Sequence, residues 1–217
     1  MAIVTKSHLG TFTGKIGNMV IYQLKGQIVS RAIGKSHKPA TINQKTSRMA
    51  IEKLNHFFRD IKGYINVGFE LEAKGTTSNQ FNMAMRSNRL HIKGLYPEVE
   101  IEFAKMLVTK GLMPVVKNAK AKILTSGLKV TWDNQSAEKG MRQDDQLMLL
   151  AYFPGTIIKT RIFTTEVRRA EGRYTFKLNR DAVMPKAHLY LSFISDNRKI
   201  ISDSQYLGEI SWDNAAK

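Results

Sequence analysis

The side chains that could perform chemistry are few in this sequence, and they lie far apart. Cysteine is absent, which excludes disulfides, thiolate nucleophiles, zinc fingers and iron–sulfur sites. The five histidines are His8, His37, His56, His91 and His188. No two of them stand at the HxH or HxxxH spacing that gathers metal ligands. We therefore predict no metal site, and we interpret His56 and His188 as structural residues.

The carboxylates form no converging pair. Asp144 and Asp145 are adjacent at a turn before an expected strand, so their side chains point to opposite faces. Glu98, Glu100 and Glu102 share one face of another expected strand, a pattern typical of a solvated face. The phosphate-loop, dinucleotide-loop (GxGxxG) and nucleophile (GxSxG) patterns are absent. The sequence thus predicts no cofactor and no enzyme activity.

Positive charge is the signal that remains. The 217 residues include 34 Lys and Arg against 18 Asp and Glu, a formal net charge of +16. Residues 1–94 hold 15 basic and 4 acidic residues, whereas residues 95–217 hold 19 and 14. Such an excess favours acidic protein surfaces or nucleic acid as partners. The candidate docking or polyanion-contact residues are Lys15, Lys25, Arg31, Lys35, Lys38, Lys45, Arg48, Arg59 and Lys62.

A glycine-rich hairpin must position the first of these cations. Gly14 and Gly17 fit a turn or bulge before a strand, and Gly26 fits the turn inside MVIYQLKGQIVSRAI. The period of two in a strand predicts two faces. Met19, Ile21 and Gln23 share one, and Val20, Tyr22 and Leu24 share the other. Tyr22 and Phe12 could stack on bases.

Two helices should follow the hairpin. Apolar residues at helical spacing predict the first, from Thr41 to a stop at Gly63, and we expect it to cover one side of the hairpin. Its apolar face comprises Ala50, Ile51, Leu54, Phe57, Phe58 and Ile61. The second runs from Ser78 to Ile92, capped by Ser78 or Asn79.

From Glu98 onward the pattern changes to short alternating runs, the first being residues 98–111. We predict an α+β fold: an N-terminal β-hairpin plus helices, then an immunoglobulin/fibronectin type III-like antiparallel β-sandwich. The predicted domains are residues 1–95 and 96–217, with the boundary between 93 and 115. The inward residues of the sandwich should be Leu128, Val130, Trp132, Leu149, Ala151, Leu189, Leu191 and Phe193. No long flexible linker separates the two parts, so we expect them to pack together.

Five motifs carry a resemblance. They are GKIGNMVIYQLKGQIVSR, PATINQKTSR, GLYPEVEIEFAKMLVTKG, VTWDN and ISDSQYLGEI, and in this order the chain resembles an uncharacterised family common in Bacteroidota. The opening also resembles phage and prophage proteins of unknown role, through Gly14, Gly17, Gly26, Arg31, Pro39, Thr41, Gln44 and Arg48. The loop NQSAEKGMRQDD departs from the pattern because it is more charged. The resemblance implies no activity and no catalytic residues.

These observations favour a non-enzymatic structural or adaptor protein, in the setting of a phage-like or mobile-element particle. The alternative is a nucleic-acid-binding protein that uses the basic N-terminal half. A protein partner or self-assembly would suit the first hypothesis. The sequence shows no secretion signal and no apolar run of about 18 residues, the length of a membrane span. We expect a cytoplasmic protein, or one incorporated into a particle assembled there.

Overall fold

The computed structural model describes residues 2–4, 13–35, 38–124, 127–134, 140–156, 160–176 and 186–211. His8, Phe12, His37 and loop residues 135–139 lie outside these ranges. The chain divides into two compact units, Met1–Thr41 and Ile42–Lys217. The boundary near residue 95 stays a prediction, and residues on both sides of it belong to the second unit.

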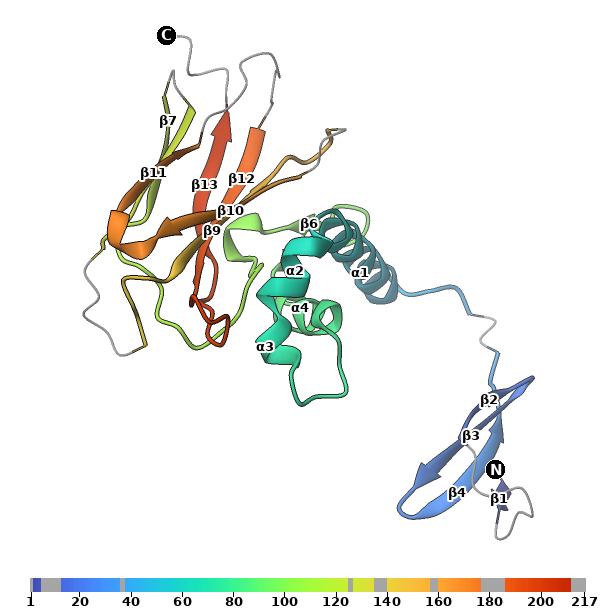
Figure 1. The fold of residues 1–217 in the computed structure, drawn as a ribbon. Helices are drawn as coiled ribbons and strands as arrows, with labels where there is room; N and C mark the ends of the chain where they lie inside the picture. The colour runs from blue at the N-terminus through green and yellow to red at the C-terminus, as the bar shows by residue number, and fades with distance from the viewer. Residues whose placement is uncertain are drawn as a thin grey trace. The chain divides into compact units, whose positions relative to one another are not determined.

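The first unit is a four-stranded antiparallel sheet (Figure 1). Its strands are β1 (Ala2–Val4), β2 (Gly14–Ile16), β3 (Met19–Leu24) and β4 (Gln27–Ala32), in the order β1-β4-β3-β2. The turn between β3 and β4 is the pair Lys25-Gly26, and both residues have positive φ (48° and 80°). A two-residue turn of this kind matches the twist of the strands, and glycine adopts it without steric cost. The expected hairpin is therefore the centre of a larger sheet.

The second unit begins with four helices: α1 (Ile42–Asp60), α2 (Lys62–Gly68), α3 (Glu70–Ala73) and α4 (Gln80–Asn88). The predicted stop at Gly63 is wrong, because α1 ends at Asp60 and Gly63 lies inside α2. The second predicted helix is α4. The Asn79 side chain caps it by accepting a hydrogen bond from the backbone N–H of Asn82 at 2.8 Å.

Two larger sheets form the sandwich of this unit. One has the order β11-β8-β7 and the other β10-β9-β12-β13, and all pairings are antiparallel. The strands are β7 (Lys120–Leu124), β8 (Gly127–Thr131), β9 (Gln146–Tyr152), β10 (Thr160–Arg168), β11 (Arg173–Phe176), β12 (Lys186–Ile194) and β13 (Gln205–Ser211). All eight predicted inward residues are buried in one apolar cluster that both sheets share. The prediction of this core is confirmed.

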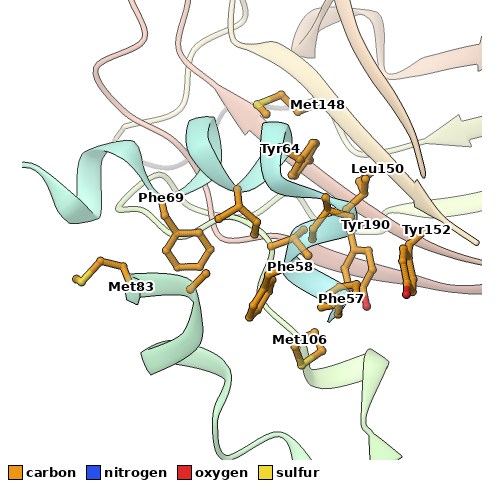
Figure 2. Packing of buried hydrophobic residues seen from close by; sticks show 14 of the residues in the cluster. Phe57, Phe58, Tyr64, Phe69, Met83, Met106, Met148, Leu150, Tyr152 and Tyr190 are labelled. Atoms are coloured by element: carbon orange, nitrogen blue, oxygen red, sulfur yellow. The ribbon is translucent and has the colours of Figure 1, made fainter. Parts of the chain in front are cut away.

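The helices cover the outer face of the sheet β10-β9-β12-β13, so the second unit has three layers: the helices, this sheet and the sheet β11-β8-β7. Alternate residues of β9 serve different cores: Leu149 lies between the sheets, and Leu150 lies under the helices. Figure 2 shows Phe57 and Phe58 of α1 and Tyr64 of α2 packed with Leu150 and Tyr190. The Tyr64 hydroxyl also lies 3.0 Å from the Ser192 hydroxyl of β12. The helices within residues 42–95 thus pack against the strands of residues 96–217, whereas the expected cover of the hairpin by the first helix stays a prediction.

The expected strand over residues 98–111 is wrong. Only β6 (Glu100–Ile101) is extended there; it pairs with β5 (Ile92–Lys93), and a 3₁₀ turn, η1 (Phe103–Lys105), follows. Met106 and Val108 then enter the core under the helices. The alternation of apolar residues correctly marks Val99 as buried, but the segment crosses the edge of the helical layer and belongs to neither sheet of the sandwich. Strand β7, which carries Lys120 and Lys122, was not predicted.

Candidate functional site

The register of the first unit sorts its side chains onto two different faces. Lys15, Val20 and Arg31 are direct cross-strand neighbours, so they share one face. Ile16, Met19 and Ala32 form the corresponding row on the opposite face. We call the first the cationic face; its residues on β2, β3 and β4 are Lys15, Val20, Tyr22, Leu24, Gln27, Val29 and Arg31. The second is the uncharged face, with Gly14, Ile16, Met19, Ile21, Gln23, Ile28, Ser30 and Ala32.

Exposure differs along these faces. On the uncharged face Ile16 and Met19 remain 56% and 46% exposed, although both are large apolar residues. On the cationic face Lys15 and Arg31 are exposed and Val29 is buried. The Arg31 guanidinium lies 5.8 Å from the centre of the Tyr22 ring, within the range of a cation–π contact. The cationic face thus offers charge, an aromatic ring and Leu24, which is 48% exposed, and the other face offers an uncharged apolar row.

The remaining candidate cations are also at the surface. Lys25 lies in the β3–β4 turn, and Lys35 and Lys38 follow β4. In the second unit, Lys45, Arg48 and Arg59 lie on α1 and Lys62 begins α2. All nine candidates are exposed, and none pairs with a carboxylate of the described residues. Of the candidate turn glycines, Gly17 and Gly26 lie in turns, and Gly14 lies within β2 with φ of 138°.

The outer surface of α1 has a hollow of about 340 Å³ beside these cations. Arg48, Glu52, Asn55 and Arg59 follow one another along it at helical spacing. Every lining residue comes from α1, so the hollow has a single wall and encloses no ligand-sized group. This surface therefore offers exposed charge without a built site.

A larger hollow, of about 550 Å³, lies where α1 and η1 meet the four-stranded sheet. Tyr152, His188 and Glu209 form one row across β9, β12 and β13. The Phe103 ring stacks on the His188 ring with centroids 4.0 Å apart. We call this the aromatic hollow; its lining comprises Lys53, His56, Phe57, Glu100, Ile101, Phe103, Tyr152, His188 and Glu209.

Neutral rings dominate this aromatic hollow. Burial lowers the pKa of His188, whose Nδ1 lies 2.9 Å from the Tyr206 hydroxyl, so the imidazole is uncharged at neutral pH. Burial, and then the Asp60 carboxylate 3.5 Å away, raises the pKa of Tyr152 to about 12. A phenol with a raised pKa is a poor base and a poor nucleophile. The two glutamates of the lining are each paired with a lysine, Glu100 with Lys93 and Glu209 with Lys186.

A buried ion pair was missed by the sequence reasoning. Asp145 and Arg169 are each 1% exposed, and Arg169 Nε donates to Asp145 Oδ2 at 3.1 Å. The guanidinium also lies 4.3 Å from the centre of the Phe193 ring. Asp145 precedes β9 and Arg169 follows β10, and the Arg169 N–H donates to the Asp145 carbonyl at 2.8 Å. The pair therefore ties the ends of two neighbouring strands together inside the sandwich core. Its partners are 24 residues apart and no motif marks them.

Two searches of the described residues give negative results. No group of three or more His, Asp or Glu side chains in the described ranges could hold a metal ion. Among the described helices, none is long and apolar enough to cross a membrane.

Comparison with known proteins identifies one family. The sequence profile of a family of unknown function, DUF6266, matches residues 11–208. No curated protein and no solved structure matches the chain. The matched residues take in most of the first unit and nearly all of the second. The chain therefore belongs to the DUF6266 family, whose function is unknown.

Proposed function

We propose that this protein is a non-enzymatic adaptor or structural binding protein, and that residues 1–41 are its docking element. One observation carries the proposal. This unit holds six basic residues and no acidic residue, and it exposes the apolar row Ile16, Met19 and Ala32 on a face where the described strands carry no charged side chain. A small sheet buries little apolar surface by itself, so an exposed apolar row is best explained as a contact surface.

The second unit would serve as the body that carries the docking element. It has two apolar cores of its own, one between the sheets and one under the helices. We propose an immunoglobulin/fibronectin type III-like fold for its sandwich, and the strand order supports this. In chain order the fourth strand, β10, pairs with the third, β9, as strand C′ pairs with strand C in the CFG sheet. Such sandwiches commonly serve as binding and display modules.

The biological setting is also a proposal. The resemblance of the opening segment to phage and prophage proteins supports a phage-like or mobile-element particle, in a bacterium of the Bacteroidota. The protein would then be cytoplasmic, or part of a particle assembled in the cytoplasm. The missing phosphate-loop, GxGxxG and GxSxG patterns of the sequence support a protein without catalytic activity.

Deletion of residues 1–38 tests the proposal. The full chain and the shortened chain would each be expressed in the source cells with a C-terminal affinity tag, and the co-purifying proteins quantified. We expect the shortened chain to lose the specific partners of the full chain and to keep a cooperative thermal transition. Retention of the same partners by a folded, shortened chain would show that residues 1–38 are not the docking element.

A further inference from the structure

We propose that the cationic face of the N-terminal sheet binds single-stranded nucleic acid, with its basic side chains on the phosphates and Tyr22 against a base. This inference rests on the proposed role of residues 1–41 as a docking element, and it assigns a ligand to the face that the exposed apolar row leaves free. The uncharged face would remain available to a protein partner.

The cations of this face are placed for a polyanion. Lys15 on β2 and Arg31 on β4 stand in one row with β3 between them, so their backbones are about 10 Å apart, two strand spacings. Both side chains are exposed, and Lys25 in the adjoining turn adds a third charge. Residues 1–41 contain no carboxylate that could neutralise them. A phosphate backbone therefore meets no competing anion within this unit.

An aromatic ring lies in the next row of the same face. Tyr22 pairs with Val29, and the Arg31 guanidinium lies 5.8 Å from the ring centre. Single-stranded nucleic acid is bound without sequence preference by a combination of basic side chains and rings on which bases stack. A four-stranded sheet with aromatic residues on its open face is one of the surfaces that does this. In a duplex the bases are already stacked, so the ring would add nothing.

The distribution of apolar residues favours nucleic acid over an acidic protein. A protein interface needs exposed apolar area beside its charges. Next to Lys15 and Arg31 the apolar neighbours are Val20, which is half-buried, and Val29, which is 3% exposed. The exposed row with Ile16 and Met19 lies on the opposite face. Leu24, 48% exposed, is the large exposed apolar residue of the cationic face, and it lies beyond Tyr22, two rows away from Lys15 and Arg31. Around Lys15 and Arg31 themselves, the cationic face thus offers charge and a ring with little exposed apolar surface.

Fluorescence anisotropy of the full chain with a labelled 20-mer of oligothymidine tests the inference. The slope of log K (the association constant) against log [NaCl] counts the phosphate contacts. If Lys15, Lys25, Arg31 and Lys35, which follows β4, each neutralise one phosphate, this slope should be about −2.8, at about −0.7 per contact. Between 50 and 200 mM NaCl the affinity would then fall about 50-fold.

Charge-neutralising variants locate the contact. Lys15→Gln combined with Arg31→Gln should reduce the slope to about −1.4, so that the affinity falls only about sevenfold between 50 and 200 mM NaCl. The matched control is Arg48→Gln combined with Arg59→Gln, which removes two exposed charges from α1 and should leave the slope unchanged. Tyr22→Leu should weaken binding about tenfold without changing the slope, because stacking releases no counterions.

Four results would overturn the inference: no binding at 50 mM NaCl, an equal loss in the α1 control, displacement of the oligonucleotide by poly-L-glutamate at equal charge, or insensitivity to Tyr22→Leu. Each of the first three results would show that the cationic face does not bind phosphates specifically. The last would show that Tyr22 does not stack on a base. Partner co-purification separates this inference from the docking role. If deletion of residues 1–38 abolishes co-purification and oligothymidine fails to bind, the docking role stands and the nucleic-acid inference falls.

Discussion

Gly68 lets the helical layer approach the segment that leads into the sandwich. It is the last residue of α2, and its carbonyl accepts a hydrogen bond from the Lys110 N–H at 3.0 Å. A β-carbon at this position would lie 2.5 Å from the Val108 carbonyl oxygen and 2.8 Å from Thr109 Cγ2. Because one of these atoms is backbone, the clash cannot be relieved by a rotamer change. Gly68→Ala should therefore force α2 away from residues 108–110.

The expected cost follows from overpacking. Extra carbon atoms in a packed site cost about 1–3 kcal/mol. The gain in helix propensity from alanine, up to about 1 kcal/mol, is small at the last residue of a helix. We expect a net loss of about 2 kcal/mol in the free energy of unfolding, or about 4–8 °C in Tm for a unit of this size.

Gly63→Ala is the matched control, because Gly63 lies in the same helix and a β-carbon there would meet no atom within 4 Å. This change should stabilise the protein by about 0.5–1 kcal/mol, through the conformational entropy that glycine loses on folding. Urea and thermal unfolding followed by far-UV circular dichroism measure both variants. If Gly68→Ala is as stable as the parent, or if both variants shift in the same direction, the close approach at Gly68 is not real.

Three further predictions concern the docking element, the buried ion pair and pH. Met19→Glu should abolish partner co-purification, whereas Leu24→Glu, on the other face of β3 at nearly equal exposure (48% against 46%), should preserve it; equal losses would argue against the uncharged face. Arg169→Met should lower the free energy of unfolding by about 3–5 kcal/mol by leaving the Asp145 charge buried and unpaired, and urea denaturation would detect a smaller cost if the pair is dispensable. Because burial holds the pKa of His188 below 6.5, the unfolded chain binds the proton first as pH falls; stability should decline through and below pH 6.5, and His188→Gln should lessen this decline in urea titrations at several pH values.

The sequence predicts the sandwich core well because each inward-facing residue packs into a single core, the one between the two sheets. Leu149, Leu189 and Leu191 alternate with other residues along their strands, and all three are buried between the sheets as expected. The intervening residues Met148, Leu150 and Tyr190 are apolar too, which is the signature of a strand covered on both faces. That signature was present in QLMLLAYF, but which element supplies the second cover depends on contacts distant in sequence.

The candidate site was predictable as a set of residues but not as a geometry. The acid-free N-terminus identifies Lys15 and Arg31, and strand periodicity correctly separates the faces of β3. That Lys15 and Arg31 share a face follows only from the register of three strands, which the sequence does not specify. Asp145 and Arg169 were beyond prediction for a similar reason, because a buried pair needs two chain segments that meet only in the folded core.

Strands β9 and β12 are a shared wall between two cores, and this limits how the chain can be divided. A fragment starting at residue 96 would keep every strand of the sandwich but would uncover Met148, Leu150, Tyr152 and Tyr190 on one side of it. These side chains would form a contiguous exposed apolar surface, and proteins with such surfaces tend to aggregate. The helices thus cover an apolar face of the sandwich that would otherwise be exposed to water. The shortest fragment that keeps this cover begins near Ile42.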